Sequence, residues 1–512
     1  MFKADLSKFN KKWLFYLLFA LVLILGVVLR VHTLFHTHNI FYDEAALLLN
    51  FKERTYGQLF LPLDYNQCCP PLFLIPSKFI YEHFGLNLIA LRAIPFIFSL
   101  ASLFLFALLS FKILKNKISV LSINIMFALS PWIFTYQMFM KQYLSDIFTT
   151  IAILLGAYYL KDKQISKLTI ILLSLLSILC ILISYTSAII IASAFIVLFF
   201  CKYDKQNKKE WLYKGLLFTG ILALFLIPYY FINMKSTMRY QDFQDYWTIF
   251  TGTFYPRKID DFKNITDVLS GNMLYFYNAM IIAFISAILM YIKDKFTLFI
   301  LFLPFVFSLI LGLLGKYPFV PERTILFLIP LFLAIILKPL DYCLVSVKSF
   351  IKNKDKKIIF AASLAFILFF VCSLNIPEFK RINKNIISGQ FTNITDYIYE
   401  KGYKKERTSN VEAALKMYKK YGIKKSDYVM AKYADRLVFQ LYDNEKILNR
   451  IIIRNPEYRF NNLPPGAIIY LYISEEYDDC YNSFKNLLEN CEIQLSVEDG
   501  AYTLIKAKKI RR

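Results

Sequence analysis

Between Trp13 and Leu374 the sequence returns repeatedly to apolar runs of the length that a membrane-crossing helix needs. Such a helix must supply roughly 20 apolar residues to cross the hydrocarbon core of a bilayer. The chain of 512 residues is 57% hydrophobic, with 50 Phe and 36 Tyr, which is more apolar than soluble domains of ordinary composition. The sequence therefore predicts a mainly α-helical, polytopic membrane protein.

Hydropathy places about eleven transmembrane helices in the first part of the chain. They are predicted near residues 12–30, 88–113, 117–135, 144–160, 167–182, 185–201, 212–232, 272–292, 295–314, 322–346 and 357–375. The first apolar run, Trp13 to Leu29, exceeds the roughly 7–15 residues of a signal-peptide core, and no small-residue cleavage site follows it. We expect this run to stay as an anchor.

The division of the long apolar run from Leu168 to Phe200 decides the topology. The run is too long for one crossing, and Ser184-Tyr185-Thr186 is its only polar break. We predict two helices joined by a tight hairpin there. A single tilted helix would move every later loop to the other side of the membrane.

The basic residues predict which side is cytoplasmic, because short cytoplasmic loops collect Lys and Arg. With the N-terminus in the cytoplasm, every short basic segment falls inside: MFKADLSKFNKK, KNK at 115–117, KDKQISK at 161–167, KYDKQNKKEWLYK at 202–214, KDK at 293–295 and KSFIKNKDKK at 348–357. The outside then holds residues 31–87, 136–143, the Ser184 hairpin, 233–271, 315–323 and everything after Asn375. This consistency favours the two-helix division and a bacterial inner (cell) membrane location.

The net charge of +23, from 60 Lys+Arg against 37 Asp+Glu, is explained by this topology rather than by nucleic-acid binding. The sequence contains no P-loop and no GxGxxG motif, so it offers no basis for an energy-coupled or NAD-dependent activity. The predicted surroundings are the lipid bilayer, with no nucleic-acid partner.

From about Ile376 the composition becomes that of a soluble domain, so we divide the chain into residues 1–375 and 376–512. NVEAALKMYKKYG is helical in pattern, whereas GAIIYLYIS and AYTLIKAKK are strand-like, which predicts a small extracytoplasmic α/β domain. Cys480 and Cys491 lie in this domain outside the reducing cytoplasm and are disulfide candidates. The cysteines within the apolar spans are expected to pack as small hydrophobic residues.

Two polar features occur in the first outside loop. Asp43 and Glu44 open the segment FYDEAALLLNFKER, whose apolar spacing predicts an amphipathic surface helix. The two acids also suit a purely structural role at the start of a helix. In YNQCCPPLFLIPSKFIYEHFG, a Pro-Pro pair predicts the start of a second surface helix. The adjacent Cys68 and Cys69 are expected to pack rather than to form a bridge.

Two further polar features fall on the same predicted side. SPWIFTYQMFMKQYLSDIF places Lys141, Tyr143 and Asp146 between the end of one helix and the start of the next. An ionisable residue at membrane depth costs about 2.5–3.5 kcal/mol on insertion scales, so Lys141 and Asp146 should face a polar cavity or each other. A snorkelling lysine beside a helix-start aspartate is the alternative. In KYPFVPERTILFLIP, Glu322 and Arg323 precede an apolar helix, and the guanidinium suits bidentate phosphate contact or a charge at the interface.

The four histidines, His32, His36, His38 and His83, all lie in the first outside loop. Their loose spacing names no zinc ligand set, which favours packing or loop hydrogen bonds. No cofactor is assigned, although a divalent metal held by Asp43 and Glu44 stays open.

In this order and on one side, the DE pair, the PPLF segment, KQYxxD and an extracytoplasmic tail resemble the C-type integral membrane glycosyltransferases. The phrases SPWIFTYQMFMKQYLSD and KYPFVPERTILFLIP are similar to members of the bacterial aminoarabinose-transferase and protein O-mannosyltransferase-like group. The resemblance covers residues 10–375 and excludes the tail. It departs from the pattern at QCCPP, where relatives often carry a basic residue or a histidine.

The resemblance implies a polyprenyl-phosphate-linked sugar donor. Asp43 matches the carboxylate that orients or deprotonates the acceptor, with Glu44 as its neighbour, and Asp146 matches a second acidic position. Lys141 and Arg323, with Tyr143 in the KQYxxD motif, match groups that hold the lipid phosphate.

The predicted activity is transfer of a hexosyl or pentosyl unit to an envelope glycan, lipid or protein. One base with facing cations favours inversion, and Glu44 and Asp146 keep a retaining route open. A transporter or flippase of lipid-linked sugars is the alternative, although repeated halves and interrupted mid-membrane helices are missing from the sequence.

Overall fold

The computed structural model describes residues 3–35, 40, 42–65, 67–203, 208–235, 254–352 and 357–375, and in the C-terminal region 428–430, 451–452, 463, 467–474, 491–498 and 502–510. The chain divides into two compact units. The membrane unit comprises Met1–Thr37 and Leu59–Ile394, and the second unit comprises His38–Gln58 and Thr395–Arg512. The predicted boundary after residue 375 falls where a stretch outside the described residues begins, so it stays a prediction.

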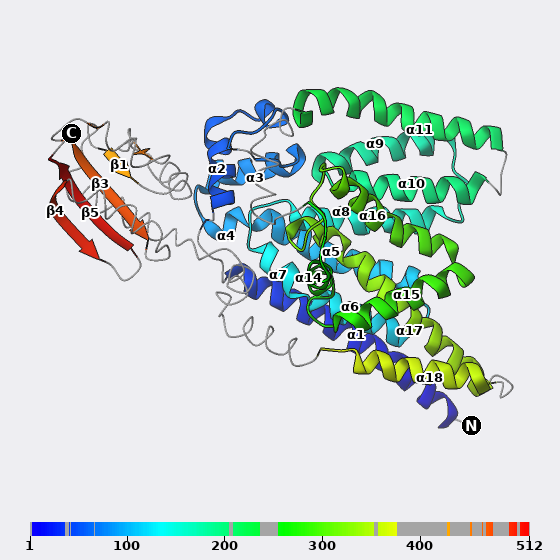
Figure 1. Cartoon of the computed structure of the whole chain (residues 1–512). Coiled ribbons are helices and arrows are strands. Elements are labelled where there is room, and N and C mark those ends of the chain that lie inside the picture. Colours follow the sequence, from blue (N-terminus) through cyan, green and yellow to red (C-terminus); the bar gives the residue numbers. More distant parts are fainter. Residues whose placement is uncertain are drawn as a thin grey trace. The chain divides into compact units, whose positions relative to one another are not determined.

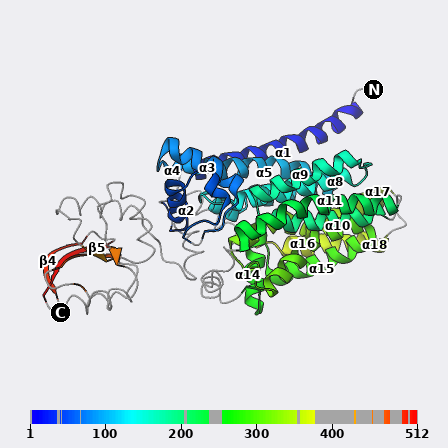
Figure 2. The same ribbon diagram turned by 90° about the horizontal axis from the view of Figure 1, so that it is seen from above.

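All regular elements in the described part of the membrane unit are helices (Figure 1). Its first half contains α1 (Lys3–Phe35), α3 (Pro71–Phe84), α4 (Leu88–Leu91), α5 (Ala93–Ile113), α6 (Lys117–Ala128), α7 (Pro131–Gln137), α8 (Tyr143–Leu160), α9 (Lys167–Ile183) and α10 (Ser187–Tyr203). Its second half contains α11 (Lys208–Tyr229), the π-helix η2 (Tyr230–Met234), α14 (Ile259–Ser270), α15 (Phe276–Lys293), α16 (Lys295–Leu313), the 3-10 helix η3 (Arg323–Leu328), α17 (Ile329–Lys352) and α18 (Lys357–Cys372). The long helices run side by side with roughly aligned axes (Figure 2).

The predicted membrane character is confirmed. Within the described residues, eight helical stretches are long and apolar enough to cross a membrane, and shorter apolar helices lie at Lys167–Ile183, Ser187–Tyr203 and Ala361–Cys372. These stretches coincide with the predicted spans. The protein is therefore a multi-pass, mainly α-helical membrane protein, while the exact number of crossings stays a prediction.

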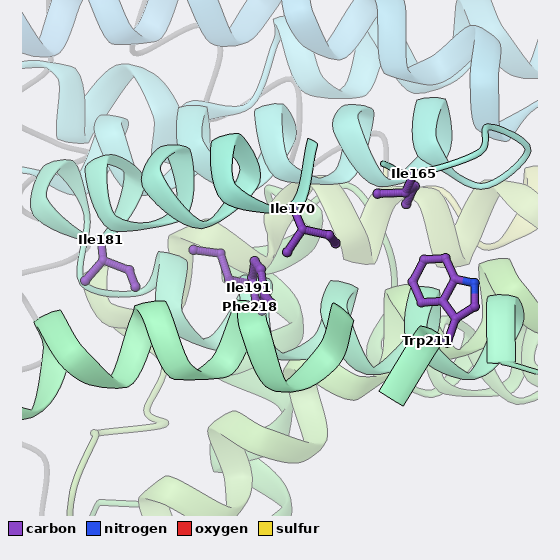
Figure 3. Close-up of a cluster of buried hydrophobic side chains, with 6 residues drawn as sticks. All are labelled: Ile165, Ile170, Ile181, Ile191, Trp211 and Phe218. Atoms are coloured by element: carbon purple, nitrogen blue, oxygen red, sulfur yellow. The ribbon is translucent and has the colours of Figure 1, made fainter. Parts of the chain in front are cut away.

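The long apolar run from 168 to 200 is two helices, as its polar break predicted. α9 ends at Ile183 and α10 begins at Ser187. Six buried side chains pack between these helices and α11 (Figure 3), and they are Ile165, Ile170, Ile181, Ile191, Trp211 and Phe218. Because the apolar faces of three helices close on this cluster, the chain folds back at the Ser184 turn.

One predicted span is interrupted near its C-terminal end. α6 ends at Ala128, and the chain restarts as α7 with Pro131 in the first turn. Proline has no N–H to donate and its preceding residue avoids helical geometry, so the helix breaks before it. Ser130 is accordingly extended, with φ −65° and ψ 115°. The break places the polar turn after α7 at the start of α8.

The basic turns meet at one end of the helices. Lys161 after α8 lies 3.5 Å from the Asp294 carboxylate between α15 and α16. Lys202 near the end of α10 donates to the Lys163 carbonyl at 2.7 Å. Buried Asp341 in α17 accepts from the backbone N–H groups of residues 115 and 116 at 2.9 and 2.7 Å. Three of the segments predicted to face the cytoplasm, 161–167, 202–214 and 293–295, are therefore joined to one another, and the segment 115–117 is attached to α17.

The second unit contains α2 (Tyr42–Glu53) and a C-terminal sheet, and the 3-10 helix η1 (Gly57–Phe60) crosses the unit boundary. Every residue from Glu44 to Phe51 in α2 is buried. This burial is wider than one face of an amphipathic helix, because Ala45 to Leu49 are consecutive apolar residues that cover all sides of more than one turn.

The C-terminal sheet has the strand order β2-β1-β3-β5-β4. Its strands are β1 (Tyr428–Met430), β2 (Ile451–Ile452), β3 (Ile468–Ser474), β4 (Cys491–Glu498) and β5 (Tyr502–Lys509). β1 is parallel to both β2 and β3, whereas β5 is antiparallel to β3 and β4, with an irregularity in β4 at Ile493/Leu495. The two predicted strands, β3 and β5, are confirmed and adjacent. The predicted helix at 410–422 lies outside the described residues.

Candidate active site

The loop that precedes α3 is bound by side chains from two distant turns. We call Gln67, Cys68 and Cys69 the 67–69 segment, which has no regular structure of its own. Gln142 Nε2 donates to the Cys68 carbonyl at 3.3 Å, and Gln142 Oε1 accepts from Cys69 Sγ at 3.2 Å. Tyr185 OH donates to the Cys69 carbonyl at 3.3 Å. Irregular backbone at this place needs such partners, and they hold the segment in position.

Lys141 contacts the 67–69 segment. It lies in the turn between α7 and α8 and is buried, and its ammonium donates to Gln67 Oε1. Burial raises the pKa of the Cys68 thiol to about 11, although the charge of Lys141 opposes this shift. Burial also raises the pKa of the Cys69 thiol well above its ordinary value. Both cysteines are therefore neutral thiols at physiological pH, which agrees with the expected packing role.

Arg323 approaches the same turn from another part of the chain. Its guanidinium carbon lies 5.9 Å from the centroid of the Tyr143 ring. Tyr143 in turn packs edge-on against Tyr136, with centroids 5.2 Å apart. Because Tyr143 is two residues after Lys141, the fold places both predicted phosphate-binding cations at the start of α8. A cation in this position is attracted to the face of the ring.

Asp146 lies in the first turn of α8 and is buried. Ser184 Oγ donates to Asp146 Oδ1 at 2.6 Å, and the Ser184 and Thr186 hydroxyls are 3.0 Å apart. The carboxylate is thus attached to the α9–α10 turn. Tyr185 of this turn also shares a 2.8 Å hydrogen bond with Tyr229 in α11.

The 315–323 loop closes the site near Arg323. Tyr317 OH donates to the Thr324 carbonyl at 2.7 Å, and the Phe319 N–H donates to the Phe254 carbonyl at 2.8 Å. Burial raises the pKa of Glu322, and the neighbouring Arg323 charge opposes this shift. Gly312 leaves room for the loop, because a Cβ there would lie 2.9 Å from the Phe254 carbonyl oxygen.

Asp43 and Glu44 lie in the first turn of α2, in the second unit. Asp43 is partly exposed and Glu44 is buried. Their approach to Lys141 and Arg323 stays a prediction. A carboxylate in the first turn also favours the helix dipole, so the structural role expected from the sequence is compatible with this position.

Of the remaining histidine and cysteine candidates, some lie within the described residues and others lie outside them. His83 contacts the Phe79 carbonyl at 2.8 Å and its ring packs on Phe79, which is a local role. His36, His38 and Cys480 lie outside the described residues. The disulfide hypothesis for Cys480 and Cys491 is therefore untested, and Cys491 begins β4. No group of three His, Cys, Asp or Glu within the described ranges is arranged to hold a metal ion.

Sequence reasoning did not identify Gln67, Ser184, Tyr185 or Tyr229 as part of this site. Gln67 was noted only as part of QCCPP, where the sequence departs from the family pattern. Ser184 and Tyr185 were noted only as part of the predicted hairpin between two helices. Neutral polar residues carry no distinctive spacing, so their partners become visible only once the helices are packed. Among the neutral polar residues of this site, Gln142 could be found from the sequence, because it is part of the KQYxxD motif.

The fold resembles that of the C-type integral membrane glycosyltransferases, which confirms the resemblance seen in the sequence at the level of architecture. The chain is similar to the aminoarabinose transferase ArnT from Cupriavidus metallidurans bound to undecaprenyl phosphate, with a TM-score of 0.54 at 11% identity over 97% of this chain and 98% of that one. The apo form of the same protein matches with a TM-score of 0.50 at 11% identity over the same shares.

The oligosaccharyltransferase from Archaeoglobus fulgidus in the apo form is also similar, with a TM-score of 0.48 at 12% identity over 91% of this chain and 70% of that one. No protein-family model and no curated protein matches the sequence. At these identities the likeness establishes the fold, and the chemistry must be argued from this chain's own residues.

Proposed function

We propose that this protein is a glycosyltransferase that moves a monosaccharide from a polyprenyl-phosphate donor to an acceptor of the cell envelope. The observation that carries the proposal is that Lys141 lies in the turn before α8 and Arg323 lies over Tyr143, the first residue of α8, within a fold similar to a transferase bound to undecaprenyl phosphate. A lysine and an arginine together suit a phosphate that carries a developing negative charge. The bilayer would supply the lipid-linked donor.

The reaction needs a bond broken at the anomeric carbon. As the bond to the donor oxygen breaks, its electron pair leaves with the polyprenyl phosphate, and the acceptor oxygen forms the new bond at the same carbon. Lys141 and Arg323 would stabilise the phosphate as its charge increases. A carboxylate would take the proton from the acceptor hydroxyl. No separate general acid is required, because phosphate leaves as an anion.

We assign the base role to Asp43, with Glu44 as its neighbour and Asp146 as a second acid. Asp146 accepts a hydrogen bond from Ser184 on Oδ1, which supports an orienting role more than free proton transfer. A mechanism with one base and phosphate-binding cations is the inverting arrangement. Tyr143 would position Arg323 through its ring.

The two ends of the membrane unit support a proposal for the sidedness of the reaction. The candidate site gathers the turns at 138–142, 184–186 and 315–323, whereas the basic turns at 161–167 and 293–295 meet at the other ends of α8, α9 and α16. Because cytoplasmic loops collect basic residues, we place the site and the C-terminal domain outside and the N-terminus in the cytoplasm of a bacterial cell.

The test is transfer from a radiolabelled polyprenyl-phosphate sugar in membranes prepared with and without the protein. We expect a labelled envelope product that depends on the protein and is lost in Lys141→Met. Lys117→Met is the matched control, because this exposed lysine lies at the basic end of α6. Transfer that survives in Lys141→Met at the wild-type rate would overturn the role of this cation.

A further inference from the structure

Gln67, the neutral residue beside Lys141, has a side-chain amide whose direction is fixed by hydrogen bonds at both its nitrogen and its oxygen. Gln67 is buried, its backbone N–H donates to the Asp64 carbonyl at 3.3 Å, and its Nε2 donates to the Tyr65 carbonyl at 3.2 Å. The amide is therefore held with its carbonyl oxygen directed at the Lys141 ammonium. The orientation is set by the loop itself.

We propose that Gln67 is a positioning residue for phosphate binding, which fixes the direction of the Lys141 ammonium without contributing a charge that would compete with the anion. This inference rests on the proposed function and names how that site holds its donor. An ammonium has three donors in rotatable geometry, so one fixed acceptor restricts its direction, and a neutral acceptor does so without offsetting its charge. A carboxylate at position 67 would restrict it equally but would offset its positive charge.

The surroundings of Gln67 support a specific rather than a general packing role. The next two residues are held by Gln142, which directly follows Lys141 in the chain. The segment that carries the acceptor and the turn that carries the cation are therefore tied together by two adjacent residues. This arrangement fixes the Gln67–Lys141 pair although its members are 74 positions apart in sequence.

Two nearly isosteric substitutions separate charge from hydrogen bonding. Gln67→Met removes both side-chain hydrogen bonds and adds no charge. Gln67→Glu keeps an acceptor for Lys141, loses the donor to Tyr65 and adds a negative charge. Gln137→Met is the control, because Gln137 is also a buried glutamine and donates to a backbone carbonyl, that of Arg30, at 2.7 Å.

The measurement is the Kd of the purified full-length protein in nanodiscs for polyprenyl phosphate, which requires no knowledge of the acceptor. We expect Kd to rise about tenfold in Gln67→Glu, because the added carboxylate offsets the charge of Lys141. We expect a rise of about threefold in Gln67→Met, because a hydrogen bond to a charged group is lost. Gln137→Met should lower Tm without changing Kd. In a Lys141→Met background, Gln67→Met should change Kd by less than about twofold, since a pairwise effect vanishes when one partner is removed.

The outcomes separate this inference from the function on which it rests. If the wild-type protein does not bind polyprenyl phosphate, the donor assignment fails and the inference fails with it. If the wild-type protein binds and Gln67→Glu binds equally well, only the positioning role is overturned. An equal loss of affinity in Gln67→Met with and without Lys141 would also overturn it, because the effect would then be general loosening of the loop.

Discussion

Ser184 donates its hydroxyl hydrogen to Asp146 Oδ1 across 2.6 Å, which joins the α9–α10 turn to the first turn of α8. Both residues are buried. The turn that reverses the chain is thus attached to the helix that carries the candidate site. The same turn holds the 67–69 segment through Tyr185, so its position affects both sides of the Lys141 environment.

Removing this hydroxyl should destabilise the membrane unit. In Ser184→Ala, the buried Asp146 oxygen loses its donor, and we expect a loss of about 1–3 kcal/mol in unfolding free energy. Thermal unfolding in detergent, followed by tryptophan fluorescence, measures the change. Ser193→Ala is the control, because Ser193 is buried in α10 and bonds only the Ile189 carbonyl of its own helix, at 2.8 Å. Equal stability of the two variants would contradict the prediction.

Asp43→Asn should abolish transfer and leave the protein folded in the membrane. The amide has nearly the shape of the carboxylate but does not accept the acceptor's proton. The assay is transfer from a labelled polyprenyl-phosphate sugar, alongside the size-exclusion profile. Asp162→Asn is the control, since Asp162 is exposed at the basic end of α8. Full activity of purified Asp43→Asn would refute the base assignment.

Arg323→Ala should weaken donor binding more than it alters acceptor choice. The guanidinium beside Tyr143 would contact the phosphate, which is common to every donor of this class. We expect the donor KM to rise by about tenfold, with Arg323→Lys in between because it keeps the charge and loses the planar fork. An unchanged dependence of the rate on donor concentration would count against this role.

The two cysteines of the 67–69 segment should react slowly with alkylating reagents at neutral pH. Burial raises the pKa of Cys68 to about 11, so the reactive thiolate is less abundant than for an ordinary cysteine and increases only as the pH approaches that value. At pH 8 about one thousandth of the Cys68 thiol would be ionised. Mass mapping after iodoacetamide treatment, with the same protein unfolded in denaturant as the reference, checks this. Rapid alkylation of Cys68 at pH 7 would contradict it.

Local patterns in the sequence were sufficient to predict most helices of the membrane unit. The break at Ser184, the start of α3 at the Pro-Pro pair and the strands β3 and β5 all appear where composition and spacing place them. These features can be predicted because they depend on residues that are close together in the sequence. A membrane span needs a continuous apolar run, and a proline affects the helix only around its own position. The interruption before Pro131 was missed, because hydropathy averages over one polar residue inside an apolar run.

Sequence alone thus determined that the chain is a multi-pass helical membrane protein, that its basic turns separate from its polar ones, and that Lys141 and Arg323 are the cations to consider. Only the tertiary structure decided that Gln67 contacts Lys141, that Ser184 contacts Asp146 and that Arg323 lies over Tyr143. These pairs join residues far apart in the chain, so they depend on how whole helices pack. Hydropathy is a local property of the sequence, so it does not predict which helix ends contact one another.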